Sequence, residues 1–150
     1  MSLHRGDFRW FLIIGAMWAA LIVSVFAPAS LWLQVTSVHV EDTIVGVTPE
    51  MNVDRAVNRE FSAEWTVTVM RKGSNGYSAY CTANGANDYS PDTSLPDDLT
   101  LDWWTWPTKC PLPVGGYRVK TLWVLHLPLF PDKEVRNVSN VFKVTDAPPS

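Results

Sequence analysis

Hydrophobic and polar positions divide the chain into a short polar tail, one long apolar run and a longer stretch of alternation. The run from Trp10 to Leu33 contains no Asp, Glu, Lys, Arg or His. A helix needs about 20 apolar residues to cross the hydrocarbon core of a bilayer. The run therefore predicts a transmembrane helix over residues 10–33, after a tail at residues 1–9, with Trp10 and Trp32 at the two membrane interfaces.

The flanking charges predict the direction of this helix. Arg5 and Arg9 precede the run, and the first charges after it are those of Glu41 and Asp42. Basic residues stay on the cytoplasmic side of a membrane. We therefore expect a single-pass protein with a cytoplasmic N-terminus and a C-terminal domain in a periplasmic or extracellular space, with the lipid bilayer as one partner.

A cleaved signal peptide is the alternative. Ala27-Pro28-Ala29 resembles a small-residue cleavage site, and the tail before the run is basic. However, the apolar stretch from Trp10 to Phe26 exceeds the roughly 7–15 apolar residues of such signals. We favour an uncleaved signal-anchor, and a secreted or periplasmic module cut near Ala29 remains the alternative.

Small residues line one face of the predicted helix. Ala16, Ala20, Ser24 and Ala27 recur at spacings that place them on the same side. Such faces allow close helix packing, which makes this face a candidate surface for a homo-oligomer or another membrane helix. The alternative is that small residues are simply frequent in membrane helices.

After the run, β-branched residues and alternation predict one domain over residues 34–145. In the clearest strand, 61–71, Trp65, Val67 and Val69 alternate with polar residues and form a buried face. The strand at 117–127 places five side chains on one face, those of Tyr117, Val119, Thr121, Trp123 and Leu125. Other strands are expected at 35–47, 77–83, 99–106 and 137–145, the last with Val138, Phe142 and Val144 directed inward.

Polar segments separate these strands. A loop or helical turn is expected at 52–59, turns at 72–76 and 128–133, a long loop at 84–98 and a disordered end at 146–150. About seven short strands with regular turn signals and no amphipathic helix indicate a mainly β domain, an antiparallel sandwich.

The segment from Leu112 to Tyr117, LPVGGY, looks like the turn into a tyrosine corner, and the final strand ends Phe-x-Val. These features are similar to those of membrane-anchored immunoglobulin-like and fibronectin type III-like modules, and the resemblance implies an immunoglobulin-like sandwich. The cysteines depart from the pattern of antibody domains, in which a disulfide joins strands B and F across the core. Here Cys81 and Cys110 both precede the Tyr117 strand. The resemblance therefore supports the architecture and not antibody-type recognition.

Cys81 and Cys110 are the two cysteines of the chain. Beyond a membrane such a pair favours a disulfide, with two buried thiols as the alternative. Closing the loop over residues 82–109 stabilises a fold by about 3–4 kcal/mol in the chain-entropy model.

Charge and motif content argue against several functions. The net charge of −3, without basic clusters, argues against nucleic-acid binding. His4, His39 and His126 lie far apart without zinc-ligand spacing, no serine has a G-x-S-x-G setting, and no Gly-rich phosphate loop follows a strand. We expect neither enzymatic activity nor a cofactor.

Two groups of residues are candidate sites in the domain. Trp104 and Trp106 lie opposite the inward face of their strand, and exposed aromatics are frequent binding hot spots that also stack on sugars. Burial under the preceding loop, or contact with the membrane surface, is the alternative. Four aspartates of that loop are candidate calcium ligands, namely Asp88, Asp92, Asp97 and Asp98. The alternative is a loop whose carboxylates are simply solvated.

These observations favour an accessory or recognition protein that presents its domain outside the cytoplasm for interaction with other proteins. The partner would bind the sandwich surface or the membrane helix. A calcium- or glycan-binding domain is the alternative from another functional class.

Overall fold

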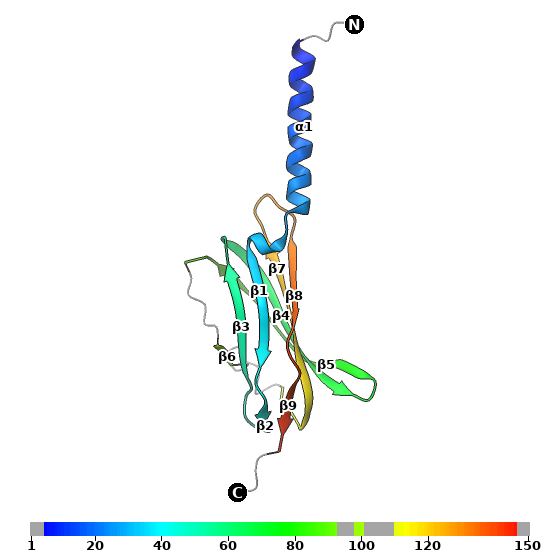
Figure 1. The fold of residues 1–150 in the computed structure, drawn as a ribbon, viewed down its shortest axis with the longest axis vertical. Coiled ribbons are helices and arrows are strands. Elements are labelled where there is room, and N and C mark those ends of the chain that lie inside the picture. The colour runs from blue at the N-terminus through cyan, green and yellow to red at the C-terminus, as the bar shows by residue number, and fades with distance from the viewer. Residues whose placement is uncertain (1–4, 93–97, 101–109, 147–150) are drawn as a thin grey trace.

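A single helix, α1 (Arg5–Phe26), stands at one end of a two-layered β domain (Figure 1). The structure, a computed structural model, describes residues 5–92, 98–100 and 110–146, with the side chains of 5–7 and 98–100 excepted. The N-terminus lies at the far end of the helix, and the chain leaves the domain at the opposite pole (Figure 1).

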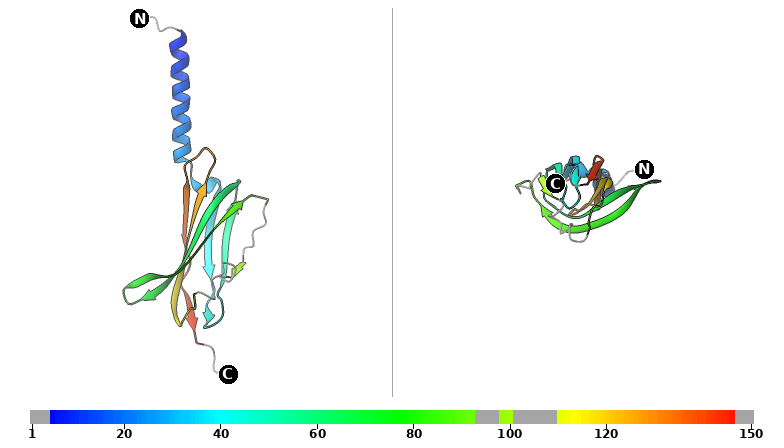
Figure 2. Two further views of the ribbon diagram at one scale, coloured as in Figure 1. Left: turned by 180° about the vertical axis from the view of Figure 1, so that it is seen from behind. Right: turned by 90° about the horizontal axis from the view of Figure 1, so that it is seen from below.

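The domain is mainly β and its strands form two sheets. Its elements are η1 (Ala29–Leu31), β1 (Leu33–Val40), β2 (Thr43–Ile44), β3 (Glu50–Val57), β4 (Phe61–Gly73), β5 (Gly76–Tyr89), β6 (Asp98–Thr100), β7 (Gly115–His126), β8 (Lys133–Val138) and β9 (Phe142–Thr145). One sheet has the order β1-β3-β6, and the other has the order β2-β9-β7-β4-β5, with β8 also paired to β7. The larger sheet curves strongly when the domain is seen along its length (Figure 2).

The pairing is antiparallel except between β2 and β9, which run parallel. The larger sheet is therefore mixed, whereas the sequence predicted purely antiparallel strands. The two layers enclose one core of apolar side chains from both sheets, as expected for a sandwich.

The two strands with the clearest alternation are confirmed. Val67 and Val69 of β4 are buried, and Trp65 packs against the core from the same face. The predicted inward face of β7 is also buried, namely Tyr117, Val119, Thr121, Trp123 and Leu125.

Three sequence predictions were wrong in this domain. Residues 52–59 were expected to form a loop or one helical turn, but β3 extends to Val57 and its residues Met51 and Val53 are buried. Asn84–Tyr89, expected as loop, extends β5 along the whole length of β4. Val138 is 56% exposed and does not point inward, because β8 ends there and the chain resumes as β9 only after an interruption.

The predicted end of the helix was also wrong. The helix ends at Phe26, and Trp32 is 5% exposed in the core of the domain, edge-to-face with Phe130 at a centroid distance of 5.1 Å. Leu33 is buried as the first residue of β1. Trp32 therefore does not mark a membrane interface, and Pro28, which cannot continue a helix, follows the real boundary.

Two side chains bridge the gap between β8 and β9. Ser139 exchanges two bonds with the backbone of Val119, its N–H donating to the carbonyl and its Oγ accepting from the amide, both at 2.8 Å. The Asn140 amide does the same to Val40 of the other sheet, accepting at 2.7 Å and donating at 2.9 Å. Asn140 thereby makes the two hydrogen bonds that a neighbouring strand would make to Val40, and it links the two sheets.

Candidate functional site

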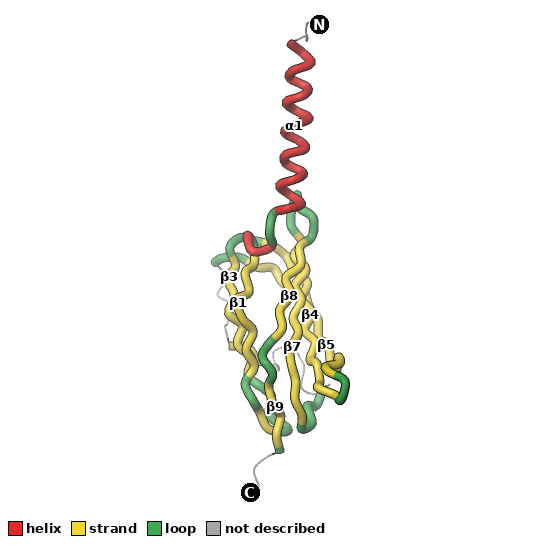
Figure 3. Tube along the Cα trace, turned by 45° about the vertical axis from the view of Figure 1, so that its right-hand side comes forward, coloured by secondary structure: helices red, strands yellow, loops and turns green. Residues whose placement is uncertain are grey.

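An apolar groove lies at the end of the domain farthest from α1. It has a volume of about 420 Å³ and is formed by the loop between β2 and β3, by β5 and by the segment before β7. Its lining residues are Val45, Gly46, Val47, Thr48, Pro49, Tyr80, Cys110, Pro111, Leu112 and Pro113. Figure 3 shows loops beside β9 at this pole of the domain.

A disulfide and a hydrogen bond fix one wall of the groove. Cys81 of β5 is bonded to Cys110, with 6.2 Å between their Cα atoms, which confirms the predicted pair. The adjacent Tyr80 donates its hydroxyl proton to the carbonyl of Pro111 at 2.8 Å. The segment before β7 is therefore held against β5, and this wall is pre-formed.

A second tyrosine secures the other end of that segment. Tyr117 is fully buried, and its hydroxyl donates to the carbonyl of Pro113 at 2.6 Å. Its ring stacks on Phe142 at 5.6 Å and meets Tyr80 edge-on at 6.2 Å. Burial raises the pKa of Tyr117, and the positive charge of Arg71 opposes this shift.

The rim of the groove combines apolar surface with one cation. Val45 and Val47 of the turn after β2 are exposed, and Val114 is exposed on the other side. Arg71 lies 5.7 Å from the centroid of the Tyr80 ring, and its Nη2 donates to the carbonyl of Val114 at 3.4 Å. Such a surface can bury an apolar side chain of another protein.

At the opposite end, a lysine joins the domain to the helix. Lys133 of β8 donates from Nζ to the carbonyls of Ser24 and Val25, at 3.1 and 2.7 Å. These carbonyls belong to the last turn of α1, where no further helical N–H is available and a cation is favoured by the helix dipole. The domain itself thus caps the end of the helix.

The predicted helix face is only partly free. Ala16 and Ala20 are exposed, Ser24 is half-buried, and Ala27 lies just beyond α1, where it packs against the domain core. Homo-oligomerisation through this face stays a prediction.

The other predicted sites are less well covered. Trp104, Trp106 and Asp97 lie outside the described residues, as does the side chain of Asp98. Asp88 accepts a hydrogen bond from Ser62 Oγ at 2.6 Å. The described part of the chain contains no group of three or more His, Cys, Asp or Glu residues placed to hold a metal ion, and the calcium site stays a prediction.

Sequence reasoning missed the groove. Its walls come from segments 45–49, 80 and 110–113, and nothing in their spacing announces that they meet. The two usable signals were the cysteine pair and the LPVGGY segment, which together bring the last two walls into contact.

No protein-family model matches the chain, and no curated protein sequence matches it significantly.

Proposed function

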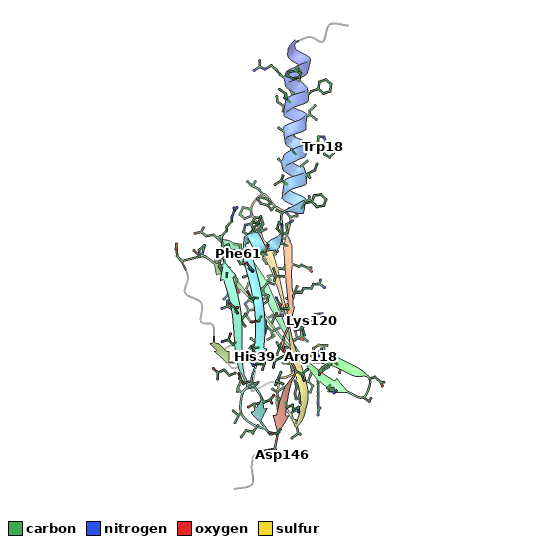
Figure 4. All side chains as sticks on the ribbon, in the orientation of Figure 1. Trp18, His39, Phe61, Arg118, Lys120 and Asp146 are labelled. Atoms are coloured by element: carbon green, nitrogen blue, oxygen red, sulfur yellow. A yellow bond between two sulfur atoms is a disulfide. The ribbon has the colours of Figure 1, made fainter. Side chains whose placement is uncertain are left out.

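We propose that this chain is a single-pass membrane protein that holds a protein-interaction module outside the cytoplasm. The observation that carries the proposal is the exposure of α1. Its apolar side chains, Trp18 among them, project away from the helix and from the domain (Figure 4). Within the described residues, one stretch, Phe8–Phe26, is long and apolar enough to cross a membrane, and none of it is buried. A bilayer is the solvent that such a surface favours.

The junction supports a retained helix. A signal sequence passes the same tests of length and composition, so these tests do not separate an anchor from a cleaved leader. Cleavage near Ala29 would leave the core residue Trp32 in place but would remove the carbonyls of Ser24 and Val25 that Lys133 binds. N-terminal sequencing of the mature protein from isolated membranes tests this, and a mature chain beginning near Ser30 would contradict anchoring.

The immunoglobulin-like character of the sandwich is part of this proposal. It is supported by the hydroxyl of Tyr117, which binds a carbonyl a few residues upstream, as in a tyrosine corner. It is further supported by the two-sheet core.

The groove is the surface that we propose for the partner. It combines apolar walls, a rigid frame and a position at the pole away from the anchor, which leaves it accessible to a neighbouring protein. A photo-crosslinking residue at Val47, in the groove rim, should capture a partner in native membranes. The same residue at Asn84, exposed on β5, should not, and equal capture at both positions would contradict the assignment.

Glycan binding is the second candidate, and one observation favours it. A more polar hollow of about 390 Å³ lies near the helix end and is lined by residues that include Glu60, Phe61, Ser62, Asp88 and His126. Hydroxyl, carboxylate and aromatic groups together are typical of sugar sites. Asp88→Asn should weaken binding to a glycan array, whereas Asp146→Asn, at the other pole, should not.

A further inference from the structure

The loop between β7 and β8 carries an unexplained apolar tip. Leu129 is 98% exposed, the highest value among the exposed large hydrophobic side chains of the described residues. Its φ of 66° is in the left-handed region, which residues other than glycine rarely adopt. A neighbouring turn bond, from the Phe130 N–H to the Leu127 carbonyl at 3.3 Å, accompanies this conformation. The domain gains no core contact from this leucine, so its own packing does not account for the arrangement.

The loop is held beside the end of α1. Phe130 packs edge-on against Trp32, directly after η1, and Lys133 binds the last turn of the helix. In Figure 1 the loop rises to the level at which the helix ends. Phe26, the last residue of the helix, is 79% exposed at that level. Two unrelated segments therefore present bare apolar side chains at the same height.

The charges around this level fit a membrane interface. The tip, residues 127–131, contains no charged residue. Asp132, which lies 3.2 Å from His126 Nδ1, and Lys133 follow it, and Arg59 lies over the ring of the buried Trp32 at 5.9 Å. Basic side chains with long apolar stems, such as Lys133 and Arg59, are favoured at the headgroup level of a bilayer, while leucine is favoured just below it.

We propose that Leu129 inserts into the outer leaflet of the bilayer that α1 crosses, as a second membrane contact of the domain. This rests on the proposed function, because the helix must remain in the membrane. The lipid is chosen over a protein partner because the tip is continuous with the end of the membrane helix and is fixed to it. A helix and a loop inserted side by side would hold the domain upright.

The test uses the full chain in phosphatidylcholine vesicles with single-cysteine variants labelled with an environment-sensitive fluorophore. Cys81 and Cys110 are bonded to each other and do not react. Leu129→Cys reports on the tip, Ile22→Cys on the helix, and Asn75→Cys on the turn of the β4–β5 hairpin. The quencher is a nitroxide on the lipid acyl chain close to the headgroup, and iodide in the buffer is the aqueous quencher.

We expect the lipid nitroxide to reduce emission from positions 129 and 22 by about twofold or more, and to leave position 75 unchanged. Quenching at 22 without quenching at 129 would overturn the second contact and leave the anchored helix intact. Absence of quenching at 22 would overturn both proposals.

Two other outcomes also contradict the insertion of Leu129. Equal lipid quenching at 129 and 75 would mean that the domain lies flat on the membrane and that Leu129 makes no specific contact with it. Protection of position 129 from both quenchers would mean that protein covers it, a second copy being the first case to test by crosslinking. Leu129→Asn places a polar residue that tolerates the left-handed conformation at the tip. It should weaken the contact of the loop with the membrane without loss of folding.

Discussion

At the scale of single residues, the position of the Trp65 ring requires a glycine at position 85 on the neighbouring strand. The two face each other directly across β4 and β5. A Cβ built on Gly85 would lie 2.4 Å from Cζ2 of the indole. The ring therefore lies over the glycine, in a space that any other residue would fill.

Gly85→Ala should lower the free energy of unfolding by about 1–3 kcal/mol, because the indole must leave its position. Urea unfolding of the full chain in detergent, followed by tryptophan fluorescence, measures this. Gly73→Ala is the matched control on the same strand pair, since its Cβ would meet only an ordinary contact at 3.7 Å. A Gly85→Ala variant as stable as the control would contradict the packing described.

Two buried tyrosines make stability depend on alkaline pH. Burial raises the pKa of Tyr89, with Arg55 and a hydrogen bond from Trp123 acting against it, and burial also raises the pKa of Tyr117. The folded state holds these protons more tightly than the unfolded chain. The stabilisation is therefore complete below the unfolded pKa of about 10 and is lost as pH rises through the higher folded values.

Tyr117→Phe should reduce the free energy of unfolding at neutral pH by about 1 kcal/mol, because the hydrogen bond to Pro113 is lost. It should also make the decrease in the free energy of unfolding between neutral pH and about pH 11 shallower. Thermal unfolding across this range is the measurement. Tyr77→Phe keeps the ring that lies 4.7 Å from Arg118 and should change neither quantity. If Tyr117→Phe lost stability with rising pH as steeply as the wild type, Tyr117 would not contribute to the alkaline loss of stability.

At the scale of elements, the interruption between β8 and β9 connects the sheets. Asn140→Ala should cost about 1–3 kcal/mol, since the amide and carbonyl of Val40 both lose their partner. Hydrogen exchange at the Val40 amide should quicken as well. Asn84→Ala, on the outer surface of β5, serves as the control, and unaltered exchange at Val40 in Asn140→Ala would refute the bridge.

The strands that sequence reasoning found and missed differ in their chemistry. β4 and β7 were predictable because buried residues such as Val67 and Val119 alternate with polar residues along the chain, and because both strands are rich in β-branched residues. β3 also alternates, with Met51 and Val53 inward, but its Asn and Asp residues have low strand propensity. In the second half of β5, Gly and Asn resemble a loop, and only pairing with β4 makes them a strand. Tertiary pairing overrides local preference there.

At the scale of the whole molecule, one apolar run supplies both the exposed helix α1 and the first buried residues of the domain, Trp32 and Leu33. Lipid and a protein core both select apolar residues, so hydropathy alone could not separate Phe26 from Trp32. Pro28 was the local signal of the boundary. The groove was beyond prediction for a related reason, since its apolar residues meet only after the strands have paired.

Lys133→Met should loosen the domain relative to the helix, because the cation at the last turn of α1 is lost while the apolar stem remains. Pulsed electron spin resonance between labels at positions 14 and 75, in nanodiscs, should show a broader distance distribution. Lys143→Met, on β9 at the far end, should leave the distribution unchanged. Equal widths for both variants would contradict the role of Lys133.

The connection between helix and domain also decides what the molecule can reach. Only Ala27 and Pro28 lie between α1 and η1. Asn58 holds the chain directly after this link by bonds to the carbonyls of Ser30 and Trp32, at 3.0 and 2.8 Å, and Lys133 holds the last turn of α1 before it. A domain on a flexible stalk samples a wide volume above its membrane, whereas the short link would confine this domain to a single height when α1 spans a membrane, as we propose. Under this proposal, the groove would meet only targets that arrive at that height, such as a neighbour anchored in the same bilayer. Lateral diffusion in the membrane, more than capture from solution, would then set the rate of encounter.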